Sequence, residues 1–162
     1  MLPLSIISFA ITAAVGITVL GCATSAKTQS NTDVELQPES FEATFGGYLG
    51  SSYRVELQEN GILQYLQNPR TLTTSSGTDE HRINVTTNQW REFRRALNGA
   101  NVWRWNKDYT DSLLLGGRTW HLKVKYSDRS VDTHGCGKFP PKSEFDQFLK
   151  AVVNLVEGRE FQ

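Results

Sequence analysis

The sequence predicts an α+β domain: an antiparallel β-sheet of about five to six strands with two helices packed on one face. Two apolar patterns support this. Residues 41–67 and 120–134 contain segments that alternate between apolar and polar side chains, as half-buried strands do. Residues 89–97 and 145–156 carry apolar stripes at helical spacing. Strands followed by a helix therefore occur twice, which favours helices segregated to one face of an antiparallel sheet.

Alternation predicts three strands in the first half of the domain. Residues 41–45, 53–57 and 62–67 carry apolar side chains at alternating positions. An Asn-Gly dipeptide separates the last two segments, and this pair is a strong signal for a two-residue hairpin turn. We expect a fourth, short strand at residues 82–85.

A first helix is predicted over residues 89–97, with Thr87 or Asn88 as its N-terminal cap. Its apolar stripe consists of Trp90, Phe93 and Leu97. After the helix, Trp103 and Trp105 flank a polar residue, which predicts a short strand with both indoles on one face. We expect Trp90 to lie in the core.

The second half of the domain is predicted to contain a hairpin. Residues 120–126 and 131–134 alternate between apolar and polar, so Trp120 at the start of the pattern is expected in the core. A two-residue loop between the strands would place Lys123 opposite His134 on the wet face. The glycine-rich segment that follows is not typical of a strand, so a loop is expected there.

A second helix is predicted over residues 145–156, where apolar side chains recur three or four positions apart. Ser143 followed by Asp146 has the spacing of a capping box, although Asp takes the place of the usual Glu. Gly158 is the expected end of the helix.

Composition and charge exclude several classes of function. Lys plus Arg and Asp plus Glu number 17 each, so the formal net charge is zero, whereas a nucleic-acid-binding domain would carry a basic excess. The histidines and cysteines lack the spacing of a structural zinc site, and no phosphate-binding loop motif occurs. The sequence therefore predicts neither a metal nor a cofactor.

The N-terminal segment has the character of an export signal. Residues 2–20 carry no charged side chain and are mostly apolar. The segment ends in Val19-Leu20-Gly21-Cys22, and these four residues resemble the lipobox of bacterial lipoproteins. An ordinary signal peptide or an uncleaved membrane anchor is the alternative.

The lipobox resemblance implies a lipid anchor in a bacterial cell envelope. It implies that residues 1–21 are a signal peptide that is removed, and that the Cys22 thiol is acylated and holds the protein at a membrane. Ala23 implies sorting to the outer membrane, if the cell has one. The polar segment 22–40 then serves as a flexible tether. Residues 41–162 form a single domain.

Three residues are candidates for catalysis. Asp132, His134 and Cys136 lie two positions apart, so a strand would place them on the same face. A thiol nucleophile works with a nearby histidine and acid, so a thiol-dependent hydrolase is one hypothesis. However, such groups usually come from distant parts of a chain. An ordinary outward-facing strand is the simpler explanation of Asp132 and His134, and we favour it.

We therefore favour a non-enzymatic module that binds a protein partner or a ligand at the envelope, because no acid–base pair or metal set stands out. A third hypothesis is an inhibitor or immunity-like protein that acts through exposed loops. The polar segment 68–81, rich in Ser, Thr and Gly, is a predicted exposed loop of this kind.

Overall fold

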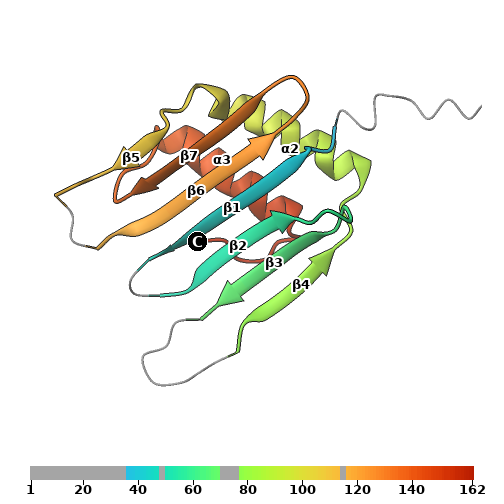
Figure 1. Cartoon of the computed structure of the whole chain (residues 1–162), viewed down its shortest axis with the longest axis horizontal. Helices are drawn as coiled ribbons and strands as arrows, with labels where there is room; N and C mark the ends of the chain where they lie inside the picture. Colours follow the sequence, from blue (N-terminus) through green and yellow to red (C-terminus); the bar gives the residue numbers. More distant parts are fainter. Residues whose placement is uncertain (1–35, 48–49, 70–76, 114–115) are drawn as a thin grey trace, which may run out of the picture.

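The computed structural model describes residues 36–47, 50–69, 77–113 and 116–162, which form a seven-stranded sheet and two α-helices (Figure 1). The strands follow the order β4-β3-β2-β1-β6-β7-β5 across the sheet. The elements are β1 (Ser40–Gly47), β2 (Ser52–Leu57), β3 (Leu63–Asn68), β4 (Asp79–Ile83), α2 (Thr87–Gly99), η1 (Val102–Arg104), β5 (Asp108–Thr110), β6 (Arg118–Lys125), β7 (Ser130–Cys136) and α3 (Lys142–Leu155). The α+β class is confirmed, but the prediction of five to six strands was wrong.

The unpredicted strand is β5, which pairs in parallel with β7 and makes the sheet mixed rather than purely antiparallel. Three residues are too few to show an alternating pattern. The strand predicted around Trp103 and Trp105 does not form. Asn101 adopts a left-handed conformation with φ 56°, and the chain then makes the short 3-10 helix η1. As a result Trp105 is buried while Trp103 is only partly buried.

Strand β4 begins earlier than predicted. It occupies Asp79–Ile83, and His81 pairs with Tyr65 of β3, so segment 68–81 is not one long loop. The apolar pattern missed the first residues of β4 because His81 takes an inward position that an apolar residue would normally fill. Residues 70–76, the middle of the predicted loop, lie outside the described residues.

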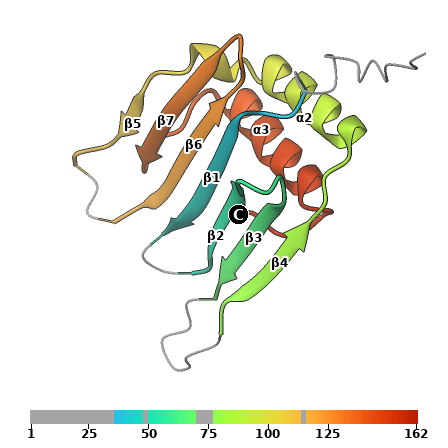
Figure 2. The same cartoon turned by 45° about the vertical axis from the view of Figure 1, so that its right-hand side comes forward.

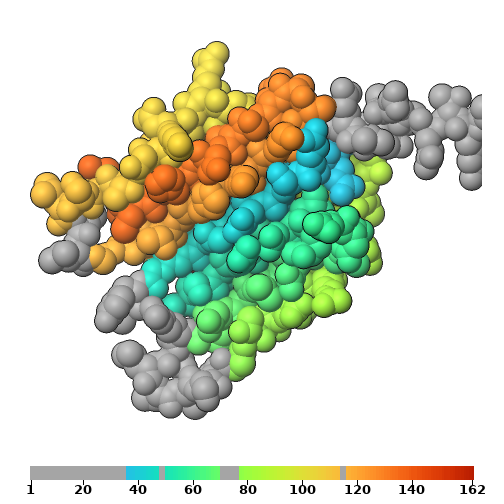
Figure 3. All heavy atoms as spheres, viewed as in Figure 1, coloured from blue at the N-terminus to red at the C-terminus, as the bar shows by residue number. Residues whose placement is uncertain are grey.

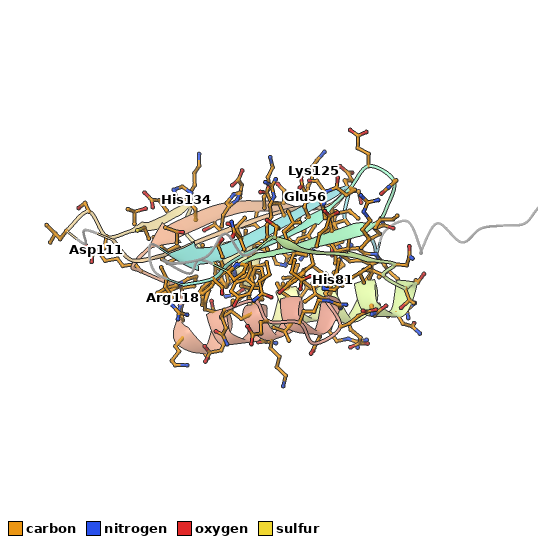
Figure 4. All side chains as sticks on the ribbon, turned by 90° about the horizontal axis from the view of Figure 1, so that it is seen from below. Glu56, His81, Asp111, Arg118, Lys125 and His134 are labelled. Atoms are coloured by element: carbon orange, nitrogen blue, oxygen red, sulfur yellow. The ribbon has the colours of Figure 1, made fainter. Side chains whose placement is uncertain are left out.

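The core lies between the sheet and the helices. Phe41 and Phe45 of β1 are four residues apart, so their side chains point to the same side of the strand. The ring centroid of Phe41 lies 4.9 Å from that of Phe93 in α2, and the ring centroid of Phe45 lies 6.4 Å from that of Phe145 in α3. Both helices are seen beyond the sheet in Figure 2 and on one side of it in Figure 4.

The helix caps differ from the predicted ones. Thr86, one residue before the predicted positions, caps α2 in a capping box with Gln89. Helix α3 starts after Pro141, which makes no side-chain cap bond, so the predicted cap from Ser143 was wrong. In the first turn of α3, Glu144 instead accepts a hydrogen bond from Trp105 Nε1 at 2.9 Å.

The β6–β7 hairpin has a register two residues away from the predicted one. Its connection comprises residues 126–129 and is closed by a 2.8 Å hydrogen bond from the Tyr126 N–H to the Arg129 carbonyl. His134 therefore faces His121 rather than Lys123. A shift of two residues leaves every side chain on the same face, so alternation alone could not distinguish the two registers.

The glycine-rich segment after the hairpin is partly strand. Gly135 and Cys136 complete β7, so the loop predicted there begins later than expected. Gly135 lies opposite Trp120, and a β-carbon on Gly135 would stand 2.4 Å from Trp120 Nε1. The indole N–H donates a 2.9 Å hydrogen bond to the Lys138 carbonyl. Trp120 and Trp90 are each 2% exposed, as predicted for core residues.

The N-terminal edge of the described chain already contacts the domain. Leu36 packs against the core, and the Glu39 N–H donates a 2.7 Å hydrogen bond to the Lys125 carbonyl. Residues 1–35, with the predicted signal segment, lipobox and most of the tether, lie outside the described residues. In the part of the chain that is described, no helix is long and apolar enough to span a membrane.

We predict that Gly135→Ala destabilises the protein. Its new methyl group would overlap the Trp120 indole, and overpacking of this kind costs about 1–3 kcal/mol of unfolding free energy. Denaturant unfolding measures the change. Gly77→Ala is the matched control, because a β-carbon there meets nothing within 4 Å. Equal stability of the two variants would contradict the role assigned to Gly135.

We predict that Tyr126→Phe raises the unfolding free energy by about 1 kcal/mol, because a buried hydroxyl without a partner is costly. Among the described residues, the Tyr126 hydroxyl is buried and has no hydrogen-bond partner. Tyr65→Phe is the control and should be destabilising, since the Tyr65 hydroxyl donates a 2.8 Å bond to the Glu160 carbonyl.

The stability of Tyr126→Phe and that of the parent protein should also respond differently to alkaline pH. Burial raises the pKa of Tyr126 above its ordinary value of 10.0, so the folded state holds this proton more tightly than the unfolded state. That stabilisation is complete below about pH 10 and is lost as the pH rises further. Tyr126→Phe should therefore lose less stability above this pH than the parent protein. An identical alkaline decline in both would contradict this prediction.

Candidate functional site on the open face of the sheet

The side of the sheet turned away from the helices is open to solvent, and we call it the open face. Figure 3 views this face, and in Figure 4 the side chains of Glu56, Lys125 and His134 point to it. Alternation along each strand decides which residues reach it. On β7, for example, Val131 and Thr133 are buried, while Asp132 and His134 are exposed.

Most charges on the open face are neutralised by neighbours. Arg54 lies 3.2 Å from Glu42 and 3.1 Å from Glu56, and Lys125 lies 2.6 Å from Glu39. These side chains are between 28% and 60% exposed, so solvent screens each pair, which contributes only about 0–1 kcal/mol to stability. Their effect is to leave this part of the face without a strong charge of either sign.

The predicted residues Asp132, His134 and Cys136 do share the open face of β7, but they do not form one hydrogen-bonded group. His121 Nε2 of β6 lies 2.9 Å from Asp132 Oδ1, and His134 Nε2 lies 3.6 Å from Asp108 Oδ1 of β5. Cys136 is a half-buried free thiol. Within the described chain, no hydrogen bond joins it to a histidine. Asp132 and His134 therefore each pair with a residue of another strand, and neither pairs with the Cys136 thiol.

The two carboxylates are held in their ionised form. The hydrogen bond from His121 lowers the pKa of Asp132, with smaller contributions from the charges of Lys123 and Lys107, while burial opposes the shift. Hydrogen bonds from Thr110 lower the pKa of Asp108, and the charge of His134 adds to this. Neither group is tuned toward proton transfer near neutral pH.

Sequence reasoning missed His121 and Asp108 as partners of the candidate residues. His121 belongs to the predicted hairpin, and its relation to His134 depends on the register. Asp108 reaches His134 only because β5 joins the sheet in parallel beside β7. A four-residue hairpin connection, instead of a two-residue one, would have placed His121 opposite His134. We find no local pattern that could have indicated that Asp108 lies beside His134.

A hollow of about 530 Å³ lies elsewhere on the open face, near the end of β1. The residues lining it come mainly from neighbouring strands and are mostly small or polar: Thr44, Phe45, Gly46, Gly47, Ser52, Tyr53, Arg54, Leu66, Asn68, Thr78 and Thr119. Gly46 lies between Ser52 and Thr119, and a β-carbon on it would stand only 2.8 Å from that of Ser52. The absence of a side chain at this central position leaves the hollow open. We call it the Gly46 hollow.

A second hollow, of about 400 Å³, lies between α2 and α3. Its lining mixes apolar and polar side chains: Asn88, Gln89, Glu92, Phe93, Ala96, Ala151, Asn154 and Leu155. Neither hollow is lined by Asp132, His134 or Cys136. The predicted catalytic residues therefore stand outside both concave surfaces.

Among the residues that the structure describes, no group of three or more His, Cys, Asp or Glu side chains is placed to hold a metal ion. Compared with known proteins, the chain matches no family model and no curated sequence.

Proposed function

We propose that this protein is a non-enzymatic binding module of the bacterial cell envelope, held at a membrane by a lipid on Cys22. The observation that carries the binding role is the Gly46 hollow. Its volume of about 530 Å³ falls within the range of known small-molecule sites, roughly 300–1,000 Å³. Its lining offers hydroxyls, an amide and a guanidinium, which are groups that hold a polar ligand rather than transform it.

The alternative, a thiol-dependent hydrolase built on Cys136, has less support. A cysteine nucleophile works through a base within hydrogen-bond reach, and the base is oriented by a third group. Here the carboxylate of Asp132 is bonded to His121, and the carboxylate of Asp108 stands beside His134. Neither histidine is hydrogen-bonded to the Cys136 thiol within the described chain, so no base is in place to activate it. All three candidates also lie on an open strand surface, where water would compete with a substrate.

The composition of the Gly46 hollow points to a polar ligand. Four of its residues carry exposed or partly exposed hydroxyls: Thr44, Ser52, Thr78 and Thr119. Arg54 can donate to a ligand, although its charge is already balanced by Glu42 and Glu56. A neutral, hydroxyl-rich or amide-rich compound therefore fits better than a strongly charged one.

The hollow lies at the end of β1 away from the point where the chain enters the sheet. Ser40, where the chain enters the sheet, pairs with Lys125, whereas Gly47 pairs with Arg118. Eight residues of extended strand span roughly 25 Å. A domain tethered through its N-terminal side thus presents the hollow at its far end, where a ligand or partner has access. Ala23 next to Cys22 is the basis for proposing the outer membrane as the destination.

We predict that Thr119→Trp abolishes ligand binding, because its indole would cover the hollow. The matched control is Lys123→Trp, on the same strand and the same face but outside the lining. Affinity selection with a mixture of sugars, amino acids and short peptides, read by mass spectrometry, would identify compounds held by the parent and the control. If no compound is retained, or if Thr119→Trp retains the same ones, the binding proposal fails.

We predict that Cys22→Ala removes the lipid and releases the protein from the membrane fraction. In cells fed an alkyne fatty acid, the parent protein should carry the label and Cys22→Ala should not. Cys136→Ala is the control and should be labelled normally, because it removes the chain's other cysteine. Each buried CH₂ of an acyl chain contributes about 0.8 kcal/mol, so loss of the lipid should be decisive. Membrane retention of an unlabelled Cys22→Ala would instead support an uncleaved anchor.

A further inference from the structure

Two of the three histidines face each other across the β6–β7 hairpin. His121 and His134 are direct partners in the antiparallel register. The Gly137 N–H donates to the Arg118 carbonyl at 3.0 Å, and the Tyr126 N–H donates to the Arg129 carbonyl at 2.8 Å. Arg118 and Tyr126 thus belong to hydrogen-bonded pairs, and they lie three and five residues from His121. Hydrogen-bonded and non-hydrogen-bonded pairs alternate along an antiparallel ladder, so an odd separation changes the type of pair. His121 and His134 are therefore a non-hydrogen-bonded pair.

The backbone of His134 agrees with this assignment, since its N–H donates to the Lys107 carbonyl on the other side of β7, at 3.1 Å. In non-hydrogen-bonded pairs the side chains approach most closely, with Cβ atoms about 4.5–5.5 Å apart. Two imidazoles at that separation can contact one ion between them. Both side chains are accessible, with exposed fractions of 30% for His121 and 50% for His134.

Each imidazole has a carboxylate beside one nitrogen. Asp132 Oδ1 lies 2.9 Å from His121 Nε2, and Asp108 Oδ1 lies 3.6 Å from His134 Nε2. A neutral histidine that donates its Nε2–H to a carboxylate keeps a lone pair on Nδ1. Within the described chain neither Nδ1 takes part in a hydrogen bond. The hydrogen bond between His121 and Asp132 is the usual outer arrangement of a histidine metal ligand, because it fixes the tautomer and makes the ligand more basic. Asp108, at 3.6 Å, is an ion-pair partner of His134 rather than a hydrogen-bond acceptor.

We propose that His121 and His134 together bind a divalent transition-metal ion that prefers imidazole, such as Cu²⁺, Ni²⁺ or Zn²⁺. Their Nδ1 atoms supply the two protein ligands, and water fills the remaining positions. The site has only two protein ligands because no larger ligand group exists in the described chain.

The surrounding charges favour this class of ion over Ca²⁺ or Mg²⁺. Those ions require several carboxylate or carbonyl oxygens. Asp132 is hydrogen-bonded to His121, and Asp108 Oδ1 accepts the Thr110 N–H at 2.7 Å. Lys123 and Lys107 offset the charge of Asp132. Cys136 is not assigned as a ligand, because its Sγ lies beside Gly117, 3.8 Å from the position that a β-carbon there would take.

The test is a Cu²⁺ titration of the full chain, prepared in detergent without a purification tag and followed by calorimetry and electron paramagnetic resonance. We expect one tightly bound Cu²⁺ per chain with nitrogen hyperfine structure. Loss of an outer carboxylate weakens known sites about 10–100-fold, so His121→Gln and His134→Gln should each weaken binding at least as much. His81→Gln is the matched control, since His81 lies on β4 beside Asp79, and it should bind Cu²⁺ as the parent does.

Three outcomes would overturn the site: unchanged binding in His121→Gln and His134→Gln, equal loss in His81→Gln, or loss in Cys136→Ser. Nuclear magnetic resonance of the parent protein needs no substitution, and Cu²⁺ should broaden the ring signals of His121 and His134 but not those of His81. The metal site is independent of the Gly46 hollow. Ser52→Trp, which would fill the hollow from β2, should retain Cu²⁺ binding, which separates failure of one proposal from failure of the other.

Discussion

The packing of the Trp120 indole against Gly135 governs how the β6–β7 hairpin and the chain leading into α3 fit together. The indole lies against a strand position that has no side chain, and its N–H is satisfied by the Lys138 carbonyl. Its ring also packs against those of Trp105 and Phe145, with centroid separations of 5.9 Å and 5.1 Å. One buried side chain thereby joins β6, β7, the turn into α3 and α3 itself. A buried indole N–H without a partner would be costly, so the path of the chain after β7 is part of the same arrangement.

This contact has consequences on the other side of the sheet. With Trp120 opposite Gly135, the neighbouring positions on the open face are also determined, and His121 must stand opposite His134. The alternative register would move Gly135 opposite Leu122 and pair His134 with Lys123. An interaction in the core therefore decides whether two imidazoles, or an imidazole and an ammonium group, meet on the surface.

Sequence reasoning succeeded where the information is local. The exposure of Asp132 and His134, and the burial of Trp90 and Trp120, follow from the alternating or helical spacing of their neighbours. It failed for β5, which is too short to show a pattern, and for Trp103 and Trp105, where the left-handed conformation of Asn101 replaced a strand with a 3-10 turn. Of the candidate site, the shared face was predictable. The partners of each residue were not, because Asp108 and His121 come from other strands.

For β1, β2, β3, β6, β7 and the two helices, the pattern of apolar residues was enough to predict which side chains face the core and which face water, because that choice depends only on spacing along a few residues. The balanced charge and the lipobox-like segment are also properties of the sequence alone. Only the tertiary structure decided the hairpin register, the addition of β5 and the opening left by Gly46. The physical reason is that a strand shifted by two residues keeps every side chain on its face. The choice between such registers therefore rests on contacts between distant residues, such as Trp120 and Gly135.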